Sequence, residues 1–191
     1  MSTRIVETKR LNLQGITEQD LLTLHMWRNS KAFCNFCSTR RNYIDLESFR
    51  DELLNDFKRD KQKQLIAFRK RDNKPIGTIW TYNLNLTDGH IFITTFVDPA
   101  YNKIGYGVEM FTSVVYSLFH EFPTLNKIYT EAYSYNIHSL SIMKKFGFLE
   151  EGVFLEHRLI DGIRYDLYRL AFYKKQFLEV TDFINKLLII K

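Results

Sequence analysis

The chain is poor in the residues that mark flexible linkers, cross-links and membrane spans. Its 191 residues include only 8 glycines, 3 prolines and 2 cysteines, and they contain no low-complexity tract or internal repeat. No run reaches the roughly 18 apolar residues that a membrane-spanning helix needs. The opening MSTRIVETKRLNLQG lacks the apolar centre of a signal peptide. We therefore expect a cytoplasmic protein with no membrane partner.

The two cysteines form a CxxC motif at Cys34 and Cys37. Such a motif can bind zinc or carry redox chemistry, but a zinc site needs two further ligands, and His25 is the one nearby candidate. We interpret the pair as two reduced thiols in the partly buried segment AFCNFC, and we expect no metal.

The composition predicts one sizeable core. The chain is 45% hydrophobic and 15% aromatic, which excludes a disordered chain. Its net charge of +5 is compatible with nucleic acid or with small anionic ligands. The basic residues gather at Arg40 and Arg41 and at residues 58–63, where acids and glutamines interrupt them. We interpret the second cluster as a solvated helix end, and no nucleic-acid motif accompanies it.

Hydrophobic periodicity predicts an order of elements that alternates only in its second half. The expected elements are a strand at 9–16, helices at 17–29 and 46–60, strands at 64–70, 76–85 and 90–98, a helix at 108–122, a strand at 126–134, a helix at 136–146 that ends at Gly147, and a terminal hairpin that turns at Asp161-Gly162. This order predicts an α+β sheet domain and not a doubly wound one.

The last residues form a separate amphipathic segment. We expect one domain over residues 1–175 and an extension over residues 176–191, with apolar positions at Phe177, Leu178, Phe183, Ile184, Leu187 and Leu188. Packing of this segment back onto its own domain is one interpretation. A contact between subunits of a homodimer is the other.

The segment DPAYNKIGYGVEMF places two glycines, Gly105 and Gly107, between a strand and a helix. Free backbone N–H groups at a helix N-terminus bind phosphate, and glycines let the anion approach closely. Lys103 would add a charged contact. The segment matches neither GxxxxGK[ST] nor GxGxxG, so a simple tight turn is the alternative.

Two sequence motifs, NKIGYG and NIHSLSIMKKFGFLEEG, occur in the order in which one known family has them. NKIGYG resembles the Q/RxxGxG/A motif of the GCN5-related N-acetyltransferases (GNAT), and NIHSLSIMKKFGFLEEG resembles that family's NxxSxxxLxKLGFxxEG stretch before its terminal hairpin. The opening ETKRLNLQG and Glu109 are similar to those of the RimJ/RimL type. The resemblance covers residues 4–173 and implies the GNAT fold, a central mixed, mostly antiparallel sheet flanked by helices.

The resemblance also implies acetyl-CoA as co-substrate, with a binding site along the second half of the chain. Main-chain groups of Phe96 and Val97 would bind the pantetheine arm, and Asn136 and Ser139 would lie near the thioester. The pyrophosphate would lie against the segment made of Asn102, Lys103, Ile104, Gly105, Tyr106, Gly107 and Val108.

Two departures from the family pattern affect the chemistry. Asn102 replaces the usual Gln or Arg, and Met143 stands where many relatives have a tyrosine that protonates the leaving thiolate. Methionine cannot donate a proton. RimJ/RimL-type members generally have an apolar residue there and use the serine of the NxxS motif instead, so the resemblance implies that Ser139 has this role. Glu131, Tyr133 and Tyr135 are the candidate general bases. The alternative is that Glu131 is an exposed strand residue and that the tyrosines are half-buried packing residues. Glu109 is expected to complement the helix dipole or to hold the neighbouring loop.

The acceptor is expected against the first two helices and the segment between them, MWRNSKAFCNFCSTRRNY. An aromatic pocket with a cationic rim, formed by Trp27, Arg28, Phe33, Arg40 and Tyr135, would favour a primary amine on an anionic carrier, such as a nucleotide-linked amino sugar. Protein N-termini, polyamines and aminoglycosides stay open, although arginines repel a polyamine. The alternative is that Trp27 and Phe33 only pack the helices on the sheet.

The expected function is thus acetyl transfer to an amine by direct attack in a ternary complex. A non-catalytic acyl-CoA-binding module of the same fold is the first alternative, and a basic nucleic-acid-binding protein is a more distant one.

Overall fold

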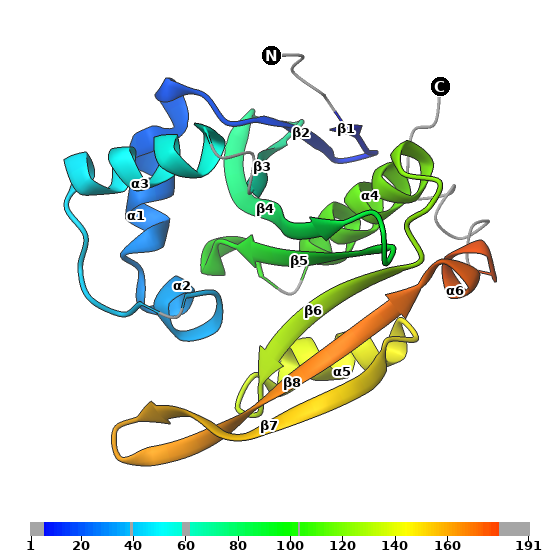
Figure 1. Ribbon diagram of the computed structural model, residues 1–191. Helices are drawn as coiled ribbons and strands as arrows, with labels where there is room; N and C mark the ends of the chain where they lie inside the picture. The colour runs from blue at the N-terminus through cyan, green and yellow to red at the C-terminus, as the bar shows by residue number, and fades with distance from the viewer. Residues whose placement is uncertain (1–5, 39, 59–61, 103, 180–191) are drawn as a thin grey trace.

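A computed structural model describes residues 6–38, 40–58, 62–102 and 104–179 (Figure 1). Lys103 and most of the expected C-terminal extension, residues 180–191, lie outside the described residues. Within the described part of the chain, no helix combines the length and the apolar character that crossing a bilayer requires.

Eight strands form one sheet in the order β1-β2-β3-β4-β5-β6-β8-β7. The strands are β1 (Val6–Glu7), β2 (Leu11–Gly15), β3 (Gln62–Arg69), β4 (Lys74–Asn85), β5 (His90–Val97), β6 (Lys127–Tyr133), β7 (Leu149–Ile160) and β8 (Ile163–Tyr173). Every neighbouring pair is antiparallel except β5 and β6, which are parallel. The α+β prediction with a mixed, mostly antiparallel sheet is therefore confirmed.

The helices lie on both faces of this sheet. They are η1 (Glu18–Asp20), α1 (Leu21–Arg28), α2 (Lys31–Phe36), α3 (Leu46–Lys58), η2 (Pro99–Tyr101), α4 (Tyr106–Glu121), α5 (Ile137–Lys145) and α6 (Lys174–Glu179). A large core cluster joins the sheet to α4, and residues of α5 pack against it. A second cluster joins α1 and α3 to the sheet through Ile66 of β3 and Phe96 of β5.

Local sequence signals account for most element ends. Thr17 and Asp20 form the start of the first helical segment, where the Thr17 N–H donates to the Asp20 carboxylate at 2.8 Å. Gly147 follows α5 with a φ of 90°, and the hairpin turn at Asp161 and Gly162 has φ values of 48° and 82°. Both positions have the left-handed backbone that the sequence predicts. Helix α2 was not expected. Ser30 caps it by accepting a hydrogen bond from the Phe33 N–H at 3.1 Å.

The beginning of the expected extension belongs to the core. Phe177 of α6 is 2% exposed and its ring lies 5.2 Å from that of Phe119 on α4. Packing of this part on its own domain agrees with the first of the two interpretations. The assignment of residues 180–191 stays a prediction.

The end of β5 depends on a glycine in the neighbouring strand. A Cβ atom added to Gly77 of β4 would lie 2.3 Å from the Phe96 carbonyl oxygen of β5. Real atoms do not approach so closely, and a backbone carbonyl cannot turn aside as a long side chain can. Gly77 therefore permits the close approach of β4 to the last residues of β5.

Replacing Gly77 with Ala should displace β5 and lower the free energy of unfolding by about 1–3 kcal/mol, the usual cost of an overpacked site. The midpoint of urea denaturation measures this change. Gly152→Ala is the matched control, because a Cβ atom at this position in β7 meets nothing within 4 Å. Equal effects of the two substitutions would contradict the argument.

Candidate functional site

The sheet opens between its two parallel strands. β5 and β6 pair only through His90–Phe92 and Lys127–Tyr129, and beyond these residues the strands separate (Figure 1). Residues 93–97 therefore have β4 on one side and no strand partner on the other. We call residues 93–97 the open edge of β5. Its main-chain groups are available to a ligand, as they would be at the edge of a sheet.

The register of β4 and β5 determines which residues face the opening. The Asp98 N–H donates to the Ile76 carbonyl oxygen at 2.9 Å. Since main-chain groups in an antiparallel pair point alternately toward and away from the partner, those of Phe96 point toward β4, while those of Thr95 and Val97 face the opening. Of the two residues expected to bind the pantetheine arm, only Val97 presents main-chain groups there. Thr95, and not Phe96, is the second residue whose main-chain groups face the opening.

Thr95 adds an unpartnered hydroxyl. Its Oγ1 atom is buried and has no hydrogen-bond partner among residues of the described ranges. Leaving a buried hydroxyl unpaired costs about 1–3 kcal/mol, so a polar ligand that reached it would be favoured. No sequence pattern marks Thr95 as a binding residue, because a strand threonine is usually a packing residue.

Cys37 lies close to the open edge of β5. Its Sγ atom lies 3.9 Å from the Thr95 carbonyl oxygen. Burial raises the pKa of the Cys37 thiol to about 12, so the thiol is protonated at neutral pH. A protonated thiol is a poor nucleophile, and Cys37 is therefore not suited to carry a covalent intermediate.

A free helix N-terminus follows the open edge. α4 begins at Tyr106, and Gly105 occupies its N-cap position with a φ of 84° and no side-chain cap. The first backbone N–H groups of this 16-residue helix carry the positive end of its dipole. A Cβ atom on Gly107 would lie 3.2 Å from the Val97 Cγ2 atom, so the helix starts close against β5. This arrangement fits a phosphate, and we call residues 104–108 the cradle.

The remaining cradle residues differ in exposure. Ile104 is 51% exposed, whereas Tyr106 is 7% exposed and Val108 is partly buried. Asn102 ends η2, where its N–H donates to the Pro99 carbonyl oxygen at 3.3 Å. Lys103 lies outside the described residues.

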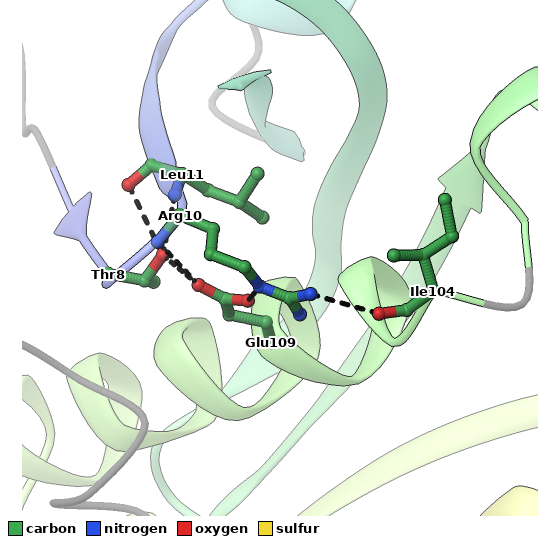
Figure 2. Close-up of polar contacts among 5 residues, drawn as sticks. All are labelled: Thr8, Arg10, Leu11, Ile104 and Glu109. Atoms are coloured by element: carbon green, nitrogen blue, oxygen red, sulfur yellow. Dashed lines mark hydrogen bonds and ion pairs between the residues drawn. The ribbon is translucent and has the colours of Figure 1, made fainter. Parts of the chain in front are cut away.

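A buried carboxylate holds the cradle to the first strands (Figure 2). Glu109 of α4 is 2% exposed. Its Oε1 atom accepts hydrogen bonds from the Thr8 hydroxyl at 2.5 Å and the Arg10 N–H at 3.0 Å, and its Oε2 atom accepts from Arg10 Nε at 2.6 Å. Arg10 Nη1 then donates to the Ile104 carbonyl oxygen at 3.0 Å. Of the two roles expected for Glu109, the structure shows the hold on the neighbouring loop.

The guanidinium of Arg10 also covers the start of α4. Its Cζ atom lies 4.6 Å from the centre of the Tyr106 ring, and its Nη2 atom would lie 3.6 Å from a Cβ atom on Gly105. Arg10 thus contacts three consecutive cradle residues, Ile104, Gly105 and Tyr106. The sequence pattern marks Arg10 only as part of the opening ETKRLNLQG, and the distance of 99 residues to Glu109 hides its role.

Helix α5 begins near the separated end of β6. The Asn136 Oδ1 atom accepts a hydrogen bond from the Ser139 N–H at 3.4 Å, so Asn136 is committed to capping this helix. Ser139 is partly buried, and its hydroxyl has no hydrogen bond within the part of the chain that the structure describes. Met143 packs against the large core cluster.

The candidate bases on β6 have partners. Glu131 forms an ion pair with Arg169, whose Nε and Nη2 atoms both donate to Glu131 Oε1, at 3.0 and 2.7 Å. Tyr133 is 9% exposed and its ring is stacked on that of Tyr135 at 5.4 Å. The Tyr135 hydroxyl donates to the Asn35 carbonyl oxygen in α2, and burial raises the pKa of Tyr135.

Arg158 of β7 joins the hairpin to α2. Its Nη2 atom donates to the Cys34 carbonyl oxygen at 2.6 Å and its Nη1 atom to the Ser38 carbonyl oxygen at 3.0 Å. Its Cζ atom lies 4.4 Å above the ring of Tyr133. One buried cation therefore links the hairpin, the end of α2 and β6. Arg158 was not singled out from the sequence.

The residues expected around the acceptor do not all share one pocket. Trp27, Arg28 and Phe33 line a cavity of about 160 Å³ between α1, α2, α3 and the sheet, together with Leu24, Cys37, Phe49, Glu52, Leu53, Gln64, Thr78 and Trp80. Arg40 is exposed and forms an ion pair with Glu52. Tyr135 lies against α2. Neither is among the lining residues.

The aromatic residues of this group also hold the fold together. Trp27 Nε1 donates to Asp98 Oδ2 at 2.9 Å. Phe33 lies 5.7 Å from the Trp80 ring and 5.1 Å from the Phe96 ring. Trp27 and Phe33 therefore pack helices on the sheet and line the cavity at the same time.

Breaking the Arg10 contacts should weaken the whole domain. We expect Arg10→Met to lower the free energy of unfolding by about 2–4 kcal/mol, because it leaves a buried carboxylate without its cation. Glu109→Gln should be similarly costly, and the double variant should cost less than the sum of the two, since the two side chains act as a pair. Urea denaturation of the four proteins measures these differences.

Lys70→Met is the control for Arg10→Met. Lys70 forms an ion pair with Glu7 at 3.8 Å, and Glu7 is half exposed, so its loss should cost less than about 1 kcal/mol. Additive effects of Arg10→Met and Glu109→Gln would contradict the pairing.

Known structures share this fold. The chain superposes on spermidine N-acetyltransferase from Vibrio cholerae, solved with CoA and spermine, with a TM-score of 0.79 and 16% identity over 88% of this chain and 98% of that one. It also superposes on RimL, the ribosomal L7/L12 alpha-N-protein acetyltransferase solved with coenzyme A, with a TM-score of 0.76 and 14% identity over 89% of this chain and 98% of that one. At these identities the likeness shows the fold.

Sequence comparison gives the family. The SPbeta prophage-derived uncharacterized N-acetyltransferase YokL of Bacillus subtilis is 29% identical over 176 residues, which cover 86% of this chain and 93% of YokL. Residues 10–149 match the family model described as an acetyltransferase (GNAT) domain. The predicted resemblance is therefore confirmed, and the chain belongs to the GNAT family of N-acetyltransferases.

Proposed function

We propose that the chain transfers the acetyl group of acetyl-CoA to a primary amine by direct attack in a ternary complex. The observation that carries the proposal is the continuity of two features, the open edge of β5 and the uncapped N-terminus of α4. Together they offer main-chain groups for a pantetheine arm and backbone N–H groups for a pyrophosphate. The family to which the chain belongs and the two neighbours solved with coenzyme A support this assignment.

Acetyl-CoA supplies an activated acyl group as a thioester. The chain's own part is to hold the amine and the thioester together, since proximity provides much of the rate enhancement in such reactions. Backbone N–H groups on the open edge are suited to stabilise the charge that develops on the carbonyl oxygen. No covalent intermediate on the protein is required, which agrees with the protonated thiol of Cys37.

Protons move at both ends of the transfer. In our proposal Ser139 donates a proton to the departing thiolate, because its hydroxyl lies in the first turn of α5 near the separated end of β6. A base must also take a proton from the amine. Glu131 Oε2 is our candidate, since both Arg169 bonds go to Oε1. Tyr133, whose ring is stacked on that of Tyr135, is the second candidate base.

Our proposal names the acceptor amine only by its chemical class. Spermidine and a ribosomal protein N-terminus are the acceptors named for the two structural neighbours, and a nucleotide-linked amino sugar is the acceptor favoured by the cationic residues Arg28 and Arg40. We propose a cytoplasmic enzyme that works on a small-molecule or peptide amine, with no role for nucleic acid or membranes.

Gly105→Ala should abolish cofactor binding. At a concentration 100 times its Kd, acetyl-CoA should stabilise the wild-type protein by about 2.7 kcal/mol, which corresponds to a rise in Tm of about 5–10 °C for a domain of this size. A Cβ atom on Gly105 would lie 3.6 Å from the Arg10 Nη2 atom. Because Gly105 belongs to the cradle, we expect the added methyl group to hinder the approach of the pyrophosphate and to remove that rise. Thermal denaturation with and without acetyl-CoA measures it.

The matched control is Gly162→Ala. Gly162 has a φ of 82°, against 84° for Gly105, so both substitutions introduce the same backbone strain, but Gly162 lies in the hairpin turn. It should lower Tm as Gly105→Ala does and keep the full acetyl-CoA effect. Absence of any acetyl-CoA effect in the wild-type protein would overturn the proposed function.

Ser139→Ala tests the proton donor. We expect kcat to fall by about 100-fold, the lower end for loss of a general acid, while the rise in Tm with acetyl-CoA stays unchanged. Thiol release against a panel of amines gives the rate. Ser141→Ala, an exposed change on the same helix, should have no effect. An unchanged kcat in Ser139→Ala would remove Ser139 from the mechanism.

A further inference from the structure

Arg28 is a buried cation without an anionic partner. It ends α1 and is 9% exposed. The one hydrogen bond of its guanidinium within residues 6–38, 40–58, 62–102 and 104–179 joins Nη1 to the Cys34 sulfur at 4.0 Å, which is a weak contact. No carboxylate in these ranges forms an ion pair with it. A buried charge without a partner is strongly unfavourable, so the protein tolerates a cost at this position.

The other buried arginines show what Arg28 lacks. Arg69 is 8% exposed and donates two hydrogen bonds to the Asp72 carboxylate. Arg158 is 5% exposed and donates to two carbonyl oxygens. Each of these guanidinium groups has oxygen acceptors provided by the fold. The guanidinium of Arg28 instead donates to the Cys34 sulfur, and Arg28 lines a cavity.

The cavity in front of Arg28 can hold a small group. Its volume is about 160 Å³, close to that of an engineered cavity of about 150 Å³ in another protein that binds benzene. The aromatic rings of Trp27, Phe33 and Trp80 form part of its wall. A cavity that combines aromatic walls with one convergent charged group is typical of a site for a small ligand.

The second charged residue of the cavity is already neutralised. Glu52 lines the cavity, but its Oε1 atom accepts a hydrogen bond from Arg40, whose side chain is 74% exposed. Arg40 is exposed and does not line the cavity, so the charge of Glu52 is neutralised by a residue outside the cavity. The polar neighbours Gln64 and Thr78 are joined by a hydrogen bond of 2.9 Å. Arg28 therefore remains the uncompensated charge of the cavity within the described chain.

The cavity shares a wall with the proposed transfer site. Cys37 lines it, and the sulfur of Cys37 lies 3.9 Å from the Thr95 carbonyl oxygen on the open edge of β5. Phe33 also lines the cavity and contacts the ring of Phe96 on the same strand. A molecule bound in the cavity would thus extend toward the open edge, where the thioester is proposed to lie.

We propose that Arg28 is the counter-ion for an anionic group of the acceptor, a carboxylate or a phosphate. The planar guanidinium can bind either group through two parallel hydrogen bonds. The acceptor would then be a small primary amine that carries a negative charge, and not a polyamine, which a buried arginine repels. This assignment rests on the proposed function and narrows its substrate class.

Inorganic phosphate tests the anion site directly. Thermal denaturation is followed with and without phosphate at constant ionic strength, in saturating coenzyme A so that the cradle is occupied. We expect phosphate to raise the Tm of the wild-type protein and to leave that of Arg28→Met unchanged. Without phosphate, Arg28→Met should be at least as stable as the wild-type protein, because it removes an uncompensated buried charge. The proposal would be overturned if phosphate left the Tm of the wild-type protein unchanged, or if it raised the Tm of Arg28→Met by the same amount.

Two further variants keep the test decisive. Arg50→Met removes an arginine of α3 that pairs with Glu18 and should keep the full phosphate effect. Arg28→Lys keeps the charge and loses the two-pronged geometry, so it should bind phosphate more weakly than the wild-type protein but still measurably. If Arg28→Met does not fold, Arg28→Lys decides: a phosphate effect equal to that of the wild-type protein would contradict a role for the guanidinium.

Acceptor kinetics distinguish an anion on the acceptor from a free anion. The panel pairs amines with and without an anionic group, such as O-phosphoethanolamine with ethanolamine and glucosamine 6-phosphate with glucosamine. We expect kcat/KM to favour the anionic members by about 10-fold or more, the value of a charge-assisted hydrogen bond, and Arg28→Met to abolish the preference. Turnover confined to uncharged or polycationic amines would overturn the assignment to the acceptor, even if phosphate binds.

The failure of this inference can be told apart from failure of the proposed function. If acetyl-CoA leaves the wild-type Tm unchanged, the proposed function fails. If acetyl-CoA raises it and phosphate does not, only the role of Arg28 fails.

Discussion

The contact between Glu109 and Arg10 is the interaction on which the candidate site depends. Glu109 lies in the first turns of α4, and Arg10 immediately precedes β2. Their ion pair attaches the helix to the first strands, and the hydrogen bond from Arg10 to Ile104 attaches the loop before the helix to the same point. The backbone N–H groups of the cradle can serve a ligand only if this loop is held still. A buried carboxylate surrounded by three donors provides that rigidity.

The second requirement is a sheet that is incomplete in one place. A continuous sheet would use all main-chain groups of β5, and none would remain for a ligand. Here the parallel pairing with β6 ends after a few residues. Gly77 allows β4 to hold the unpaired end of β5 from its other side. The helices α4 and α5 then lie on one face of the sheet, so the opening has a helix start at each of its borders.

Much of the fold could be predicted from the sequence, because it is determined locally. The left-handed positions at Gly147 and Gly162 follow from glycine's freedom at positive φ, and the alternation of apolar residues predicts the strands. The cradle could be predicted for the same reason. It consists of consecutive residues in one turn, and its chemistry resides in the backbone.

Features that depend on pairing or on distant contacts could not be predicted. Phe96 and Thr95 are adjacent in the sequence, and only the register with β4 shows which of them presents main-chain groups to the opening. The burial of Arg28 and the exposure of Arg40 depend on how α1, α2 and α3 meet. In the sequence both are simply arginines near aromatic residues. Arg10 and Arg158 have their partners about 100 residues away, where no local pattern reaches.

Arg158 also links two regions that lie far apart in the sequence, α2 and the hairpin of β7 and β8. The end of α2 contributes Cys34 and Ser38 to it, and the long hairpin of β7 and β8 contributes the arginine itself. Any displacement of α2 would therefore pull on the hairpin through that guanidinium. Substitutions that move α2 are expected to require compensating changes in the hairpin, and exchanging α2 alone for an unrelated helix would leave a buried cation without its carbonyl acceptors.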